Sequence, residues 1–153
     1  MKSIYEISFS GKKALIRVDF NVPFNELGEI RDNSRIVASL PTIKHVLSTG
    51  GSCILASHLG RPKGKDEEFS LARLIPELNR LIDADVIFLE DCIGPHTKEV
   101  CLNLTPGKVV LLENLRFYKE ETTADFNFAK ELSCLADVYL SLIHISEPTR
   151  RLR

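Results

Sequence analysis

The chain has 153 residues, of which 44% are hydrophobic and 27% charged, a balance typical of a globular protein rather than a disordered one. Its formal net charge of -1 gives no general attraction to nucleic acid or to an anionic membrane, so an anion site has to come from a local cluster of arginines. No apolar run approaches the ~20 residues of a membrane span, and residues 1–10 lack the apolar core of a secretory signal. We therefore expect a cytoplasmic protein.

The four cysteines support the same expectation. They are widely spaced and form no CxxC pair, which argues against a zinc site and against a disulfide framework. The nearest approach to a metal pattern is Cys92 with His96, and a single pair of this kind is usually coincidental. We expect no metal site.

Short apolar runs alternate with longer amphipathic stretches along the chain. The apolar runs cover residues 13–18, 52–57, 86–89 and 109–112, and their composition is typical of strands that are covered on both faces. We expect helices over residues 34–48, 70–82, 96–102 and 125–135. This alternation predicts an α/β fold with three αβα layers and a mainly parallel, Rossmann-like sheet.

Several residues mark the expected helix ends. Asn33 or Ser34 is the expected cap of the first helix, Ser70 that of the second and Asp125 that of the fourth. Pro76 should kink the second helix or shift its start, because proline cannot donate the backbone hydrogen bond of a helix interior.

Polar residues follow three of the expected strands. They occupy residues 19–23, 58–62 and 113–117, and two of these segments contain an arginine. Because parallel sheets bind ligands beyond the carboxyl ends of their strands, these segments are expected at one common site, which Arg35 can join from the start of the first helix. Guanidinium groups in this arrangement indicate a small anion, either a phosphate or a carboxylate.

Each of these residues also has a structural interpretation. An Asp or Asn after a strand commonly forms a turn or a helix cap, and His58 alone is more often a hydrogen-bonded structural residue. Arg61 lies in a charged segment that is compatible with a solvated loop, and Arg116 is compatible with a surface ion pair to Glu113 or Glu120. These interpretations do not explain why the residues occur together at three strand ends.

The glycine-rich segment at residues 60–65 is not a nucleotide-binding motif. Its GxxxGK spacing is one residue shorter than that of a P-loop, and Asp66 stands where a P-loop has the Ser or Thr that binds magnesium. The chain also lacks the G-x-G-x-x-G pattern.

Four segments resemble the phosphoglycerate kinase family, in the order and at the spacing of that family. They are RVDFNVP at 17–23, RI at 35–36, SHLGRP at 57–62 and LENLRF at 112–117. The resemblance covers residues 1–139 and implies the front part of the substrate-binding N-terminal domain, with a bacterial character between residues 117 and 128. It also implies the sheet order 3-4-2-1-5-6.

This resemblance implies a glycolytic transferase that moves a phosphoryl group between ATP and the carboxylate of 3-phosphoglycerate, giving ADP and 1,3-bisphosphoglycerate. The family's C-terminal domain, which is absent from this chain, holds Mg-ATP or Mg-ADP, and the full-length proteins are usually monomeric. We therefore expect this chain alone to be inactive, to bind no cofactor itself, and to have neither nucleic acid nor membrane as a partner.

The resemblance also implies roles for individual residues. Arg35 matches the catalytic arginine beside the transferred group, and Asp19 and Asn21 match positions that bind the hydroxyl and carboxyl end of the acid. The loop from His58 to Arg61, with Arg116, matches the positions that hold the 3-phosphate. The implied substrate-binding residues are Asp19, Phe20, Asn21, Arg35, His58, Leu59, Gly60, Arg61 and Arg116.

The resemblance ends at Tyr139. Residues 140–153 are similar to the translation of a transposase adapter used in sequencing libraries, so we expect a partial domain at 1–139 and a non-native tail at 140–153. The arginines of the tail are therefore not assigned the role of the family's further phosphate-binding arginine. We expect the missing strands to leave the edge beside the first strand unprotected and the product prone to aggregation. The alternative is that Leu140, Leu142 and Ile143 prolong the fifth strand by chance, because this run is apolar.

Two alternatives remain at this point. One is a non-catalytic module that binds a small anion with the same arginines. The other is an interaction domain whose basic tail contacts nucleic acid. Titration with 3-phosphoglycerate tests the first alternative, and salt-dependent binding that is lost on deleting residues 140–153 would favour the second.

Overall fold

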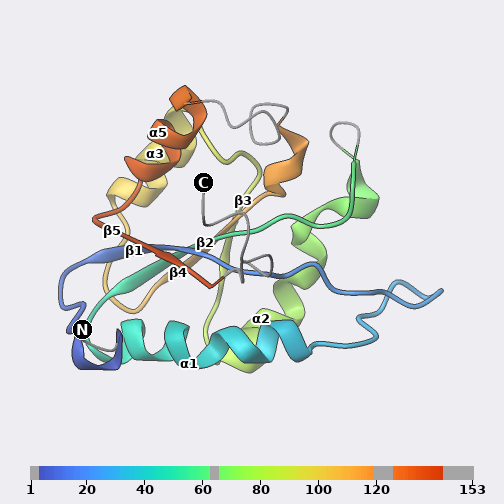
Figure 1. Ribbon diagram of the computed structural model, residues 1–153, viewed down its shortest axis with the longest axis horizontal. Helices are drawn as coiled ribbons and strands as arrows, with labels where there is room; N and C mark the ends of the chain where they lie inside the picture. Colours follow the sequence, from blue (N-terminus) through green and yellow to red (C-terminus); the bar gives the residue numbers. More distant parts are fainter. Residues whose placement is uncertain (1–3, 63–65, 119–125, 143–153) are drawn as a thin grey trace, which may run out of the picture.

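The computed structural model describes residues 4–62, 66–118 and 126–142 of the chain. Strands form a central layer between two layers of helices (Figure 1). The elements in chain order are the 3-10 helix η1 (Ile4–Glu6), β1 (Lys13–Arg17), α1 (Ser34–Ser48), β2 (Ser52–Ala56), η2 (Glu67–Phe69), η3 (Leu71–Leu74), α2 (Ile75–Ile82), β3 (Ile87–Leu89), α3 (Pro95–Leu102), β4 (Val109–Leu112), η4 (Leu115–Phe117), α5 (Phe126–Ser133) and β5 (Val138–Ser141).

The sheet is parallel throughout, with five strands in the order β3-β4-β2-β1-β5. The central strands β2 and β4 are buried at every position, which explains their continuous apolar sequence. The predicted α/β class and parallel sheet are confirmed. The observed order also agrees with the first five positions of the order that the family resemblance implied.

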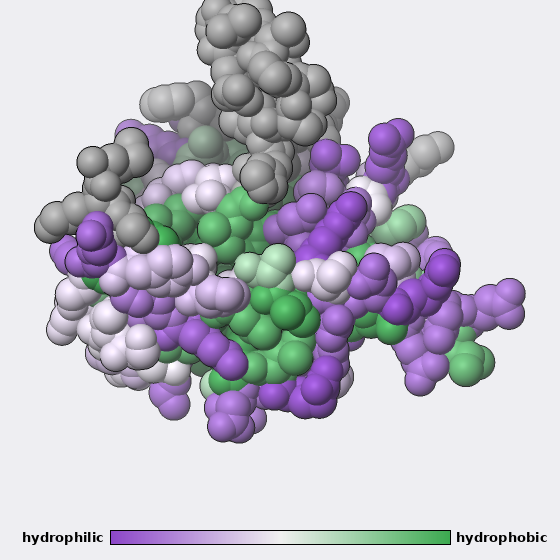
Figure 2. All heavy atoms as spheres, turned by 60° about the horizontal axis from the view of Figure 1, so that its bottom comes forward, coloured by the Kyte–Doolittle hydropathy of each residue, from purple (hydrophilic) through white to green (hydrophobic). Residues whose placement is uncertain are grey.

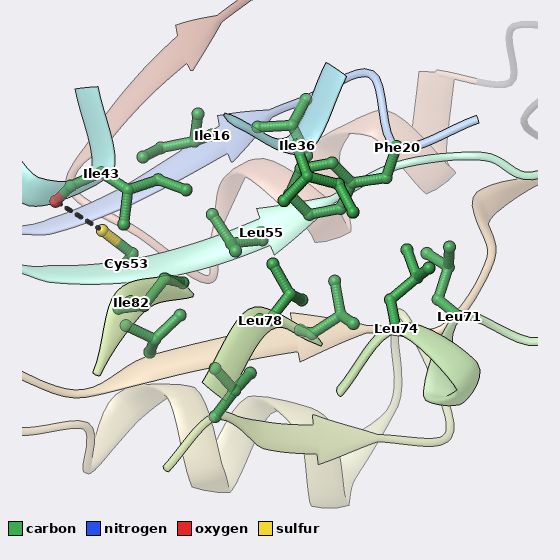
Figure 3. Packing of buried hydrophobic residues seen from close by; sticks show 14 of the residues in the cluster. Ile16, Phe20, Ile36, Ile43, Cys53, Leu55, Leu71, Leu74, Leu78 and Ile82 are labelled. Atoms are coloured by element: carbon green, nitrogen blue, oxygen red, sulfur yellow. Dashed lines mark hydrogen bonds between the residues drawn. The ribbon is translucent and has the colours of Figure 1, made fainter. Parts of the chain in front are cut away.

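Alternate residues of each strand face opposite helical layers. In β1, Ala14 and Ile16 belong to the hydrophobic cluster under α1 and α2, whereas Leu15 belongs to the cluster under α3 and α5. Figure 3 shows the first cluster, where side chains of α1 and α2 meet those of the sheet and the Cys53 thiol points to the carbonyl of Ile43. Both sheet faces are therefore covered, and the three-layer prediction is confirmed.

The expected side-chain cap of α1 is wrong. Asn33 occupies the N-cap position without a side-chain capping bond. Its Nδ2 donates instead to Glu77 Oε2 at 2.7 Å, which joins the start of α1 to α2. The N–H of Ser34 donates to Asp32 Oδ1 at 2.9 Å. A partner distant in sequence has therefore replaced the local cap.

Pro76 shifts the start of the second helix, as predicted. Ser70 caps the 3-10 helix η3, and its Oγ accepts a hydrogen bond from Ala72 N at 3.2 Å. The α-helix begins only at Ile75, so Pro76 lies in the first turn, where no backbone donor is needed. The fourth expected helix ends at Ser133 rather than Leu135, and its expected cap, Asp125, lies outside the described residues.

The expectation that the edge of β1 is unprotected is wrong, and the alternative that the apolar run prolongs the fifth strand is confirmed for Leu140. β5 pairs with β1 from Ala14 to Arg17, so the outermost strand on this side is β5 itself. Leu140 and Ser141, the first residues of the expected tail, lie in this strand, whereas the tail from residue 143 onward lies outside the described residues. None of the helices in the described part of the chain is long and apolar enough to cross a membrane.

An arm at residues 22–31 projects from the body of the molecule (Figure 1). An antiparallel bridge between Phe24 and Ile30 joins its two sides, and the guanidinium of Arg73 lies 3.8 Å from the centre of the Phe24 ring. Figure 2 shows the arm as a mainly hydrophilic extension of the surface. Leu27, 83% exposed, is the main hydrophobic exception.

Candidate functional site

The segments that follow β1, β2 and β4 leave the sheet at the same edge, which is on the right in Figure 1. This placement follows from the parallel pairing, because parallel strands bring their carboxyl ends together. The pairing continues one residue past β1, where Val18 N donates to Ala56 O at 2.9 Å. The three polar segments predicted from sequence are therefore neighbours.

Arg35 joins the loop after β1 from the first turn of α1. Its Nη1 donates to Asn21 O at 2.8 Å and to Asp19 Oδ1 at 3.3 Å. Asp19 Oδ1 also accepts a hydrogen bond from Asn21 N at 3.2 Å, which forms an Asx turn. The Asp19 carboxylate therefore both forms the turn and contacts Arg35.

Ser57, at the end of β2, connects all three segments. Its Oγ accepts a hydrogen bond from Phe20 N at 3.0 Å, and its carbonyl oxygen accepts one from Leu115 N at 2.9 Å. Ser57 is buried, so these bonds are shielded from water. The loops after β1 and β4 are thus both held to the end of β2.

A glycine allows the loop after β2 to pass close to its neighbours. Gly60 has φ +62°, and its N–H donates to Asn21 Oδ1 at 3.0 Å. A Cβ at this position would collide with the ring of Phe69. Both the backbone conformation and the close approach therefore require glycine.

Asn114 holds the loop after β4 to the loop after β2. Its side chain is fully buried and makes hydrogen bonds to Leu59, to Arg116 and to Phe69 O. The neighbouring Glu113 is also buried and accepts hydrogen bonds from Ser70 Oγ at 2.7 Å and from the N–H of Leu71 at 2.8 Å.

A surface ion pair between Arg116 and Glu113, one of the two partners considered from the sequence, is not supported. The Glu113 carboxylate is used in capping η3, and the described residues contain no ion pair between it and Arg116. The other suggested partner, Glu120, lies outside the described residues. Across residues 4–62, 66–118 and 126–142, neither the Arg61 nor the Arg116 guanidinium has a hydrogen-bond or ion-pair partner.

The predicted site residues differ in what they present to solvent. Arg35 and Arg61 are exposed, whereas Asp19, Asn21, His58, Gly60 and Arg116 are of intermediate exposure. The side chains of Phe20 and Leu59 are buried in the core, so these two residues face the site only through their backbone. Figure 3 shows Phe20 packed near Ile36.

A cleft of about 410 Å³ adjoins these loops. Asn21, Leu59 and Gly60 line one side of it, and Phe24, Gly28 and Arg73 line the other. Arg73 Nη2 donates to Gly28 O at 3.3 Å, so the guanidinium that stacks on Phe24 also anchors the arm. Arg35, Arg61 and Arg116 do not line this cleft, whereas Glu26 and Glu68 do.

Tyr118 holds the far end of η4. Its hydroxyl donates to Asp91 Oδ1 at 3.1 Å and accepts a hydrogen bond from Cys92 N at 3.0 Å. Burial raises the pKa of Tyr118 above its ordinary value, so the hydroxyl remains a neutral donor. This contact ties the segment that contains Arg116 to the loop after β3.

Ser57, Asn114 and Arg73 were not recognised as positioning residues from the sequence. Asn114 lies two residues after the apolar strand β4, and this position predicts a cap, which it does form on Arg116 N. Its bonds to Leu59 and Phe69 join residues 55 and 45 positions away and have no local sequence signal.

The described residues contain no group of three or more His, Cys, Asp or Glu side chains arranged to hold a metal ion. Cys92, which the sequence analysis paired with His96 as the nearest approach to a metal pattern, is buried. Its Sγ donates to Glu113 O at 2.9 Å. The polar edge of the sheet offers guanidinium, carboxamide and backbone groups, which suit a small anion, together with the Asp19 carboxylate.

Comparison with known proteins identifies close relatives. The model of the family described as phosphoglycerate kinase matches residues 4–141. The chain is 47% identical to phosphoglycerate kinase of Aquifex aeolicus over 140 residues, which cover 92% of this chain and 35% of the relative. It is 49% identical to that of Desulforudis audaxviator over 141 residues, covering 92% of this chain and 36% of the relative.

Solved structures of phosphoglycerate kinases have the same fold. The crystal structure from Pyrococcus horikoshii superposes with a TM-score of 0.80 at 30% identity, covering 92% of this chain and 36% of that one. The structure from Coxiella burnetii gives a TM-score of 0.76 at 31% identity, covering 88% and 33%. The chain thus spans about a third of the length of the relatives it matches.

Proposed function

Because the chain belongs to the phosphoglycerate kinase family, a family of phosphotransferases, we propose that the polar edge of its sheet binds 3-phosphoglycerate. One observation carries this proposal: hydrogen bonds from Gly60 N to Asn21 Oδ1 and from Leu59 N to Asn114 Oδ1 bring the segments with Arg61 and Arg116 to one edge, where Arg35 also lies. Guanidinium groups from two loops and from the start of α1 suit a substrate with a phosphate at one end and a carboxylate at the other.

The proposed roles are those that the family resemblance implies for each residue. Arg61 and Arg116, which have no partner within the described ranges, hold the 3-phosphate together with the backbone of the His58–Arg61 loop. Asp19 and Asn21 bind the hydroxyl and carboxyl end of the acid. Arg35, already oriented by Asn21 O, neutralises charge on the transferred phosphoryl group.

These proposed residue roles match the chemistry of phosphoryl transfer. The reaction needs alignment of donor and acceptor and neutralisation of charge, and it needs no covalent protein nucleophile. The proposed site therefore contains charged and hydrogen-bonding side chains, with their positions set by buried Ser57 and Asn114.

In this proposal Mg-ATP or Mg-ADP is held by a part of the family protein that this chain does not include. We therefore assign the chain the binding of the acid substrate and expect no phosphoryl transfer by the chain alone. The full protein is proposed to act as a monomer in the cytoplasm.

We retain the proposal that residues 1–139 form the substrate domain and that the sequence beyond Tyr139 is foreign. The family match runs to residue 141, and Leu140 and Ser141 lie in β5. Sequencing the source locus from adapter-free DNA tests this boundary. Recovery of the same residues 140–153 would overturn it.

Calorimetric titration with 3-phosphoglycerate tests the proposed function. We expect Arg116→Ala to weaken binding by about tenfold or more, because a hydrogen bond between charged groups contributes roughly 1.5–3 kcal/mol. Arg80→Ala is the matched control, since Arg80 pairs with Glu77 on α2 and should leave affinity unchanged. Absence of binding by the folded wild-type chain would overturn the proposal, and equal affinity for inorganic phosphate would indicate a general anion module instead.

A further inference from the structure

We infer that Asn114 is a positioning residue that sets the separation of the two phosphate-binding arginines, Arg61 and Arg116. This inference rests on the proposed 3-phosphoglycerate site. It concerns a side chain that does not itself reach the substrate, because Asn114 is fully buried, with 0% exposure.

The Asn114 carboxamide is fully used in hydrogen bonding. Its Oδ1 accepts from Arg116 N at 2.9 Å and from Leu59 N at 3.1 Å. Its Nδ2 donates to Leu59 O at 2.8 Å and to Phe69 O at 2.9 Å. Both acceptor positions and both donor positions are therefore occupied, which is the full capacity of the group.

These bonds join the two arginine segments through one planar group. Arg116 is bonded directly through its own N–H, and Leu59 lies two residues before Arg61. The third partner, Phe69, is the residue whose ring lies against Gly60. A change in the orientation of the carboxamide would therefore displace both segments together.

Further contacts make Asn114 a rigid support. Its own N–H donates to Glu113 Oε1 at 2.9 Å, and the Glu113 carboxylate is in turn held by Ser70 and Leu71. Hydrogen bonds in such a buried network are strong, and leaving one partner unpaired is costly. Two guanidinium groups on separate loops can share one phosphate only if their separation is held to about 0.5 Å.

The test compares 3-phosphoglycerate with glycerate, which lacks the phosphate. Asn114→Asp keeps the shape and the Oδ1 acceptor but directs an oxygen at the carbonyls of Leu59 and Phe69. We expect affinity for 3-phosphoglycerate to fall by about tenfold while affinity for glycerate is unchanged, as measured by NMR titration. The ratio of the two affinities is the decisive readout, because a purely structural role would not change it.

Asn79→Asp is the matched control. Asn79 Oδ1 accepts a hydrogen bond from Val86 N at 2.8 Å and joins α2 to the start of β3. This contact lies at the amino ends of the strands, whereas the proposed site lies at their carboxyl ends. This variant should alter stability without changing the affinity ratio. In an Arg116→Ala background, Asn114→Asp should lower the affinity for 3-phosphoglycerate by less than it does in the wild type, because one of the two positioned groups is gone.

Two results would overturn the inference, and they are distinguishable. A wild-type chain that binds 3-phosphoglycerate, with an unchanged affinity ratio in Asn114→Asp, would overturn the positioning role alone. A folded wild-type chain that binds neither ligand would overturn the proposed function and this inference together. If Asn114→Asp does not fold, Asn114→Ser replaces it: serine retains a local cap for Arg116 N but does not reach Leu59, and the same fall in the ratio is expected.

Discussion

Asn21 Oδ1 accepts a hydrogen bond from Gly60 N at 3.0 Å, and this contact joins the loop after β1 to the loop after β2. The same residue accepts a hydrogen bond through its main-chain oxygen from Arg35 Nη1 at 2.8 Å. Asn21 therefore touches two parts of the proposed site, one through its side chain and one through its backbone. The contact depends on the tight backbone at Gly60, which makes this glycine a sensitive test of the site.

Gly60→Ala should lower both the free energy of unfolding and the affinity for 3-phosphoglycerate. Gly60 has φ +62°, and a new Cβ would collide with the Phe69 ring. We expect a loss of about 2–3 kcal/mol in the free energy of unfolding, from backbone strain together with overpacking.

Gly107→Ala is the matched control for this variant. Gly107 has φ +86°, but nothing lies within 4 Å of the added Cβ, so only backbone strain of about 1 kcal/mol is expected. Urea denaturation and substrate titration of both variants provide the measurements. Equal losses of stability at the two glycines would contradict the importance of the contact with Phe69.

The sheet could be predicted well because its signal is local. β1, β2 and β4 lie within one residue of their predicted ends, since strands buried on both faces consist of nearly uninterrupted apolar residues. Val86 was predicted as the first residue of the third strand, but β3 begins at Ile87. The N–H of Val86 bonds to the Asn79 side chain, a contact that the apolar pattern does not encode.

The positions of the site segments could also be predicted, but not what holds them. Parallel pairing alone brings the ends of β1, β2 and β4 to one edge. The bonds of Asn114 to Leu59 join residues 55 positions apart, and the bond of Asn33 to Glu77 spans 44. In both cases a distant partner determines the role of a residue whose local context predicts only a cap.

The cysteines should differ sharply in reactivity toward a thiol reagent. Burial raises the pKa of Cys53 to about 12 and that of Cys101 to about 11, and Cys92 is buried as well. Cys134 is exposed, so one thiol should react rapidly in the native chain and the others only on unfolding. Mass spectrometry after brief alkylation measures this. Rapid labelling of Cys53 under native conditions would mean that the core under α1 is open.

The contact between Glu77 and its partners should stabilise the chain at neutral pH and not at acid pH. Hydrogen bonds from Arg80 and Asn33 hold the pKa of Glu77 below its ordinary value of 4.5. Because the pKa of the folded state is the lower one, this stabilisation is present above the pKa of the unfolded state and is lost as the pH falls through that of the folded state.

Glu77→Gln should therefore destabilise the chain at pH 7 by less than about 1 kcal/mol, since the Arg80 side of the contact is solvent-exposed. The difference from the wild type should shrink from pH 7 toward pH 3, because the wild-type carboxyl takes up protons as the pH falls. Urea denaturation at the two pH values measures it. A difference that grows on acidification would contradict the direction of the pKa shift.

The outermost strand β5 should make the chain prone to self-association. No described strand pairs with its outer side, and Tyr139 is 55% exposed beside a shallow cavity lined by Leu15, Leu115 and Leu132. An open edge can pair with another chain, and a lysine on it opposes such pairing. Tyr139→Lys should therefore reduce the rise of light scattering with concentration, whereas Leu102→Lys, which removes a 66% exposed side chain from α3, should not. An equal reduction by both variants would indicate general hydrophobic contact instead of strand pairing, and a sharp cooperative melt of a wild-type monomer at high concentration would contradict the association itself.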